Sequence, residues 1–230
     1  MNYLTLLLCL LGQLAFAGKP SPTPLAPWNI YYFGVGYNYT PFSAVGLGGI
    51  VSFAFHHYDT SQPYYMAGCL STTTDTAVLG DLRNKAIIVT GAVTTNGTPN
   101  FVFGGEVTGW NTGPNPPSYR VFISTSSATF TINNSTKTES VTWWVQGSVS
   151  LDMLTGVPSY TLTVPAGSLW SNGLGHLSTD PAYSAAFQYA LSHVKQAGIM
   201  FAGGSFFDVG VSILGPGEAT FTLLDFTVYP

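Results

Sequence analysis

Two adjacent histidines, His56 and His57, are among the few residues of this sequence that could carry out chemistry. They lie in the stretch FAFHHYD, directly before a tyrosine and a carboxylate. Successive side chains of a strand point to opposite faces, so adjacent histidines cannot bind one metal ion, which needs three or more converging ligands. We therefore predict the end of a strand here, with Phe53 and Phe55 in the core. His57 is expected on the core side near its rim, within reach of Asp59.

Other patterns that support catalysis are missing from the sequence. There is no G-x-S-x-G nucleophile motif, and no spacing of cysteines and histidines suits zinc. Glycosidases use two carboxylates that flank the scissile bond, whereas the aspartates and glutamates are isolated here, among them Glu106, Glu139 and Glu218. The sequence therefore predicts a protein that is not an enzyme. A glycan-active enzyme stays open as an alternative, because the fold could bring two distant carboxylates together.

The stretch VTWWVQGSVSL contains the best candidate for a binding site. Its residues alternate as in a strand, so one face carries Val141, Trp143, Val145, Val149 and Leu151. The opposite face carries Thr142, Trp144, Gln146, Ser148 and Ser150. An aromatic ring can stack on a sugar while polar neighbours bond the sugar hydroxyls, so Trp144, Gln146 and Thr142 are predicted to bind a ligand. Alternatively, a helix or loop covers Trp144, because large aromatic side chains rarely stay exposed.

The rest of the sequence predicts many short strands and one helix. Apolar and polar residues alternate repeatedly from Asn29 onward, in runs separated by Gly, Pro and Asn. Near residues 180–197 the apolar residues follow a helical period instead, at Tyr183, Phe187, Ala190, Leu191 and Val194. Asp180 is a suitable N-cap, and Gly198 is expected to end the helix. One amphipathic helix among strands indicates an all-β sandwich with the helix packed at one edge or end.

Composition and charge limit the partners of the protein. Only 7% of the residues are charged and the net charge is −4, with no cluster of Lys or Arg. Nucleic acid requires a basic face, so we expect no nucleic-acid partner. With so few charges, the polar surface must consist of Ser, Thr, Asn and Gly. Cys69 is predicted to be a buried apolar residue, with an intermolecular disulfide as the alternative.

The N-terminus has the features of an export signal. Residues 1–17 contain an apolar run that ends in Ala15-Phe16-Ala17, which fits cleavage after Ala17. The run is shorter than the ~20 apolar residues that span a bilayer, so no membrane span is expected after cleavage. Residues 18–28 form a Pro-rich spacer, and residues 29–230 are predicted to form a single domain. The predicted location is extracellular or periplasmic.

Several stretches from residue 79 onward follow one another in an order that resembles a known fold. They are LGDLRNKAIIVTGAV, YRVFIST, YTLTVPAGSLW, AFQYALSHVKQAGIMFAGG and ATFTLLDFTV. In this order the chain resembles the galactose-binding-like jelly-roll domains, which include carbohydrate-binding modules and laminin-IV-like domains of exported proteins. The resemblance implies a jelly-roll β-sandwich. It also implies a structural calcium ion, with Asp225 as its ligand on the last strand, and no other cofactor is expected.

Two hypotheses that need no catalysis follow from these observations. The first is a secreted, non-catalytic domain that binds glycan or matrix polysaccharide. The second is a structural or adhesive surface protein that associates through the edges of its sheets. Lys and Pro residues usually protect such edges, and charged residues are scarce in this sequence.

Overall fold

The structure is a computed structural model that describes residues 28–33, 39–43, 45–47, 50–59, 66–104, 107, 113, 115–127, 141–204 and 208–230. The predicted signal peptide, residues 1–17, lies outside these ranges, as does the spacer up to Trp28. Within the described part of the chain, no helix has the length and apolar character needed to cross a membrane.

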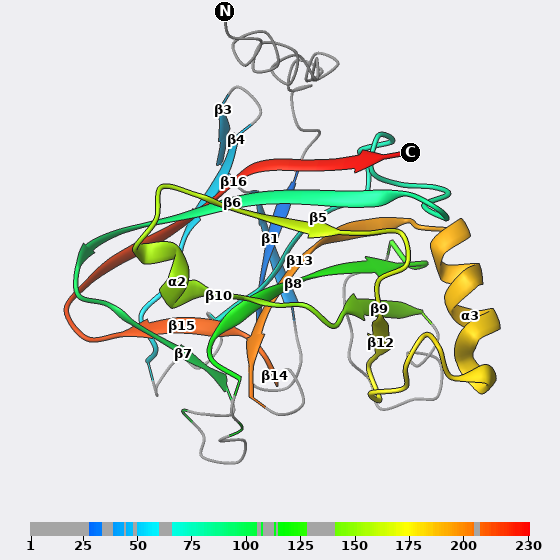
Figure 1. Cartoon of the computed structure of the whole chain (residues 1–230). Coiled ribbons are helices and arrows are strands. Elements are labelled where there is room, and N and C mark those ends of the chain that lie inside the picture. The colour runs from blue at the N-terminus through cyan, green and yellow to red at the C-terminus, as the bar shows by residue number, and fades with distance from the viewer. Residues whose placement is uncertain are drawn as a thin grey trace, which may run out of the picture.

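Most of the described residues form two antiparallel sheets that pack face to face (Figure 1). The central path of the larger sheet runs in the order β12 (Trp170–Asn172), β9 (Thr142–Val145), β8 (Ser118–Ser124), β13 (Gln196–Gly203), β5 (Met66–Thr72), β1 (Asn29–Phe33) and β2 (Tyr39–Ser43). Four short strands extend it, namely β7 (Asn100–Phe103), β10 (Val149–Ser150), β14 (Asp208–Val209) and β15 (Val211–Leu214).

The smaller sheet has the order β11 (Tyr160–Val164), β6 (Ala86–Gly97), β16 (Gly217–Tyr229), β4 (Ile50–Ala54) and β3 (Val45–Leu47). A short helix, α2 (Leu151–Thr155), lies against β6, and α3 (Pro181–Ser192) packs at the opposite end of the molecule (Figure 1). The predicted all-β sandwich with one amphipathic helix at an end is therefore confirmed.

Aromatic side chains fill the space between the two sheets. Phe53 on β4 and Phe221 on β16 contact Phe201 on β13, with ring centroids 5.3 and 5.1 Å apart. Phe221 also lies 5.7 Å from the ring of Tyr119 on β8. All four side chains are buried, as is Phe55. The burial of Phe53 and Phe55 confirms the prediction for the FAFHHYD stretch.

The stretch predicted as one strand from 141 to 151 is interrupted in the structure. Trp144 pairs with Phe122, and Val149 pairs with Tyr119. Between these two pairs, four residues, 145–148, are aligned with only two residues of β8, 120 and 121. Because the surplus is an even number, side chains beyond the interruption keep their face, and both Trp143 and Val149 remain buried. The predicted burial is correct for Trp143, Val145, Val149 and Leu151, whereas Val141 is only half-buried and Thr142 is buried. The strand is also not continuous, and α2 begins at Leu151.

Helix α3 begins where the sequence predicted and ends earlier. The Asp180 carboxylate accepts a hydrogen bond from the Ala182 amide at 2.9 Å, as an N-cap does. The helix stops at Ser192 because Val194 exchanges two backbone hydrogen bonds with Gly80, of 2.8 and 3.0 Å. This bridge directs the chain into β13. Gly198, the predicted helix end, instead lies inside that strand.

Candidate functional site

The two tryptophans of β9 face opposite sides of the larger sheet. Trp143 is completely buried and packs against Phe187 of α3, with ring centroids 5.0 Å apart. Trp144 points to the outer side and is half-buried. The neighbouring strand β12 aligns Ser171 with Trp144. The structure therefore presents part of one large aromatic ring on the outer side of this end of the sheet.

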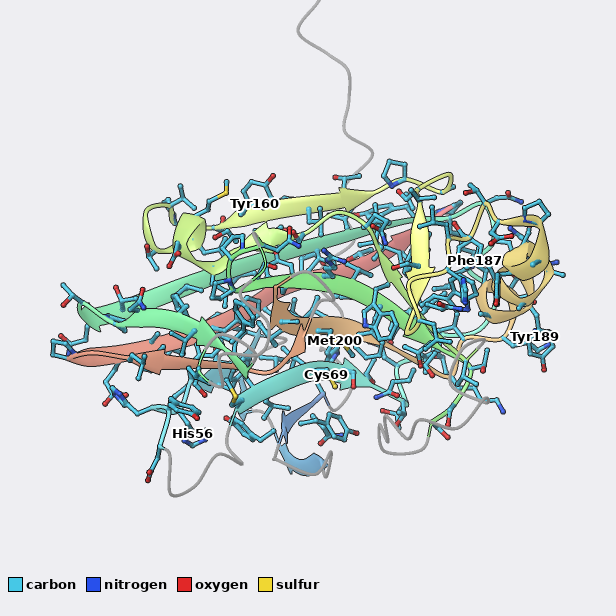
Figure 2. The ribbon with its side chains drawn as sticks, turned by 90° about the horizontal axis from the view of Figure 1, so that it is seen from below. His56, Cys69, Tyr160, Phe187, Tyr189 and Met200 are labelled. Atoms are coloured by element: carbon cyan, nitrogen blue, oxygen red, sulfur yellow. The ribbon has the colours of Figure 1, made fainter. Side chains whose placement is uncertain are left out.

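The ring of Trp144 is held in one orientation by its neighbours. Its indole N–H donates a hydrogen bond to the Met200 sulfur at 2.7 Å. Met200 is fully buried near Cys69, in the middle of the larger sheet (Figure 2). At the far edge of the indole lies Gly173, and a Cβ atom at that position would be 3.4 Å from the ring. A larger residue there would touch the ring, whereas the glycine adds no side chain over it.

Polar groups stand directly beside Trp144. The exposed Gln146 donates a hydrogen bond from its side-chain amide to the Ser171 hydroxyl at 2.5 Å. Its backbone N–H donates to the Leu169 carbonyl at 2.9 Å, which fixes Gln146 next to β12. We call Trp144, Gln146, Ser171 and Gly173 the Trp144 patch.

Thr142 occupies the predicted face but is buried. Its hydroxyl donates a hydrogen bond to the Ser124 hydroxyl at 3.1 Å. Of the three residues predicted to bind a ligand, the structure brings Trp144 and Gln146 together on the surface and leaves Thr142 beneath it. Whether any of the three binds a ligand stays a prediction.

Two residues of the patch, Ser171 and Gly173, were not predicted. They belong to a turn in which the Asn172 side chain accepts hydrogen bonds from the amides of Leu174 and His176, at 3.1 and 3.0 Å. The sequence SNGLGH carries a local signal for this turn, because Asn and Gly favour turns. The pairing of β12 with β9, which brings the turn to Trp144, has no such local signal.

Of the two adjacent histidines, His56 lies far from Phe187 and Tyr189 in the view of Figure 2. The His56 ring contacts the Tyr32 ring edge-on at 4.6 Å, and partial burial lowers its pKa. The His57 side chain is exposed, and its Nε2–H donates to the Gly217 carbonyl at 2.9 Å. The prediction that His57 lies on the core side is therefore wrong, because β4 ends at Ala54 and strand alternation no longer applies beyond it.

The described residues hold no group of three or more His, Cys, Asp or Glu side chains that could bind a metal ion. Asp225 is half-buried on β16, and its carboxylate accepts a hydrogen bond from the Thr227 hydroxyl at 2.5 Å. The predicted calcium ion at Asp225 stays a prediction.

An exposed ion pair joins Asp81 and Arg83 at 2.6 Å, and this hydrogen-bonded guanidinium lowers the pKa of Asp81 to about 2.

Comparison with known proteins gives little information. No protein-family model matches the chain, and no curated protein matches it. One similar solved structure comes from a study entitled "Prominent members of the human gut microbiota express endo-acting O-glycanases to initiate mucin breakdown". The alignment covers 93% of this chain and 96% of that chain, with 12% identity and a TM-score of 0.36. This similarity is too distant to support any argument about function.

Proposed function

We propose that this protein is an exported, non-catalytic domain that binds neutral glycan through the Trp144 patch. The observation that carries the proposal is the partly exposed indole of Trp144 beside the exposed amide of Gln146. An indole face can pack on the C–H groups of a sugar ring, and an amide can donate to and accept from sugar hydroxyls. The proposal for export rests on the predicted signal peptide, residues 1–17.

The chemistry of the patch favours an uncharged ligand. None of its four residues carries a charge, and the whole sequence contains only six Lys and Arg residues. An acidic polysaccharide would need basic side chains to balance its carboxylates or sulfates. A neutral glycan needs hydroxyl or amide partners instead, and the patch supplies an amide through the exposed Gln146, which the buried Ser171 hydroxyl holds in place.

The patch is also well ordered before any ligand arrives. Met200 fixes the Trp144 indole, while Ser171 fixes the Gln146 amide, through the hydrogen bonds described above. Ordering a flexible side chain costs about 0.5–1.5 kcal/mol on binding, so a fixed pair reduces that cost. Binding by so small a surface is still expected to be weak, in the micromolar to millimolar range.

A glycan array followed by isothermal titration calorimetry tests the proposal. We expect the wild-type protein to bind one or more neutral glycans and to ignore sulfated and uronic-acid polymers. Trp144→Ala should weaken binding by about tenfold or more, which equals about 1.4 kcal/mol. Gln146→Ala should weaken it by a smaller factor, because the indole contact remains.

Tyr189→Ala provides a matched control, because Tyr189 is an aromatic residue that is 59% exposed on α3, outside the patch. This variant should bind like the wild type. Failure of the wild type to bind any glycan at millimolar concentration would contradict the proposed function. Normal binding by Trp144→Ala would show that the ligand binds elsewhere, and release of new reducing ends from a bound glycan would indicate an enzyme.

A further inference from the structure

Strand β11 forms one end of the smaller sheet and has an open edge. It pairs with β6 along one side, from Tyr160 opposite Gly91 to Val164 opposite Ile87. Among the described residues, no backbone hydrogen bond outside this ladder involves residues 160–164. Thr161 and Thr163 are exposed, and Tyr160 is 39% exposed at the rim of the molecule (Figure 2). This strand therefore offers unpaired backbone groups along its outer side.

The edge of the larger sheet at β12, in contrast, is covered. The turn that follows β12 covers the outer side of this strand. Ser171 forms an antiparallel β-bridge with Leu177, and the Ser178 amide donates a hydrogen bond to the Trp170 carbonyl at 2.8 Å. Beyond the end of β11, helix α2 packs against β6. Covering an edge in these ways prevents it from pairing with another strand. No such cover is described for β11.

The β11 edge also lacks the features that usually prevent association. Its sequence, YTLTV, contains no charged residue and no proline. Its pairing with β6 is regular, with no bulge that would twist the edge away. Sheet edges in soluble proteins are normally protected by Lys, Pro or a bulge. An uncharged, regular and exposed edge strand is suited to pairing with another strand.

We propose that β11 pairs in antiparallel orientation with β11 of a second copy of this chain. The five residues are self-complementary about Leu162. A two-fold axis through Leu162 places Thr161 opposite Thr163 of the second copy, and Tyr160 opposite Val164. Pairing identical surfaces in this way produces a closed dimer rather than an open chain.

This register keeps each side chain on its own side of the sheet. Thr161 and Thr163 point outward, and the Thr161 hydroxyl already shares a hydrogen bond of 3.0 Å with Thr90 on β6. Opposed threonines extend this row of hydroxyls into the second copy, and cross-strand Thr pairs are favourable. Leu162 and Val164 point toward the core side. Apolar residues then meet apolar residues across the new contact, and no charge is brought near another.

Exposed apolar side chains beside β11 would gain cover in such a dimer. Met153 of α2 is 57% exposed, and Val157, in the segment that leads into β11, is 41% exposed. With Tyr160 they place three large apolar residues near one end of the strand. The dimer forms whether or not the protein binds glycan. If the proposed function also holds, each dimer carries two Trp144 patches and gains avidity for a polymer with repeated sites.

Sedimentation velocity from micromolar to millimolar protein tests the proposal. The wild type should shift reversibly from monomer to dimer as the concentration rises. Thr161→Lys combined with Thr163→Lys should remain monomeric, because each Lys would face another Lys position across the new contact. The matched control is Thr220→Lys with Thr222→Lys, which adds the same charge to the same outer face on the interior strand β16. This control should dimerise like the wild type.

A cross-linking experiment tests the register directly. Opposite residues of antiparallel strands have Cα atoms about 4.5–5.5 Å apart, within the range that a disulfide bridges. Leu162→Cys should therefore form a covalent dimer under mild oxidation, while Thr220→Cys should not. A wild type that stays monomeric up to millimolar concentration overturns the proposal. Normal dimerisation of the Thr161→Lys, Thr163→Lys variant also overturns it. If the protein dimerises but Leu162→Cys forms no covalent dimer, the proposed register is wrong.

Discussion

Single residues of β9 show how neighbours in the sequence acquire different roles. Trp143 is buried between the sheet and α3, whereas Trp144 is half-buried and bonded to Met200. Trp143→Ala should lower the free energy of unfolding by about 3–5 kcal/mol, the usual cost of truncating a buried large aromatic residue. Trp144→Ala should cost only about 1–2 kcal/mol, since it loses one hydrogen bond and part of its packing.

Urea unfolding of both variants followed by circular dichroism measures these differences. Trp144→Phe is a useful control, because it keeps an aromatic ring and removes only the N–H donor to Met200. Equal large losses for Trp143→Ala and Trp144→Ala would mean that Trp144 is a packing residue. Trp144 would then no longer be a candidate for binding a sugar.

Cys69 is fully buried and free, as the sequence predicted. Burial raises the pKa of its thiol to about 12, although a hydrogen bond with Ser71 opposes this rise. Only the thiolate reacts with alkylating reagents and disulfides. Iodoacetamide at pH 8 should therefore leave Cys69 unmodified in the native protein and label it fully after unfolding, as measured by mass spectrometry. Rapid labelling of the native protein, or a native disulfide-linked dimer, would contradict this burial.

Among the elements, β13 depends on close approach of its backbone to β5. A Cβ atom at Gly198 would lie 2.7 Å from the Ser71 Cα and would also collide with the Leu70 carbonyl. Both neighbours are parts of a central strand and cannot move aside. Gly198→Ala should therefore destabilise the protein by about 1–3 kcal/mol or more, the usual range for an overpacked core.

Gly147→Ala is the matched control for Gly198→Ala. No atom lies within 4 Å of a Cβ at Gly147, in the interruption between β9 and β10. This variant should unfold at nearly the same urea concentration as the wild type. If both variants had equal stability, the close contact between β13 and β5 would be wrong.

For the whole molecule, burial of neutral acids makes stability sensitive to alkaline pH. Burial raises the pKa of Tyr32 from 10.0 to about 12 and that of Cys69 from 9.0 to about 12. Burial also raises the pKa of Tyr119. Between the ordinary and the raised values, the unfolded chain releases protons that the folded chain retains. The stability from these groups is fully present below about pH 9 and is lost as the pH rises toward 12.

Urea unfolding at a series of pH values from neutral to strongly alkaline measures this dependence. Absorbance of the phenolate anion should show that part of the tyrosine titrates only when the protein unfolds. Tyr32→Phe should reduce the slope of stability against pH, because it removes one of the groups responsible. A stability that is constant through this range would contradict the burial of Tyr32, Cys69 and Tyr119.

The sequence by itself determined several of the buried side chains, and where the helix begins. Alternation over a few residues is a local property, so Trp143, Val149 and Phe53 could be assigned to the core without knowledge of the fold. The N-cap at Asp180 is equally local, because its carboxylate bonds an amide only two residues away. The choice of Trp144 and Gln146 as surface neighbours followed from the same alternation.

The tertiary structure alone decided where α3 ends, which residues complete the patch, and that the outer side of β11 is unpaired. The helix ends where the backbone of Val194 forms hydrogen bonds with that of Gly80. The Ser171 hydroxyl accepts a hydrogen bond from Gln146 because β12 pairs with β9. The strand YTLTV has the same pattern that a central strand could have, and only the strand order leaves its outer side unpaired. These features depend on pairing between distant segments. Such pairing is set by the packing of the complete core, which no short stretch of sequence encodes.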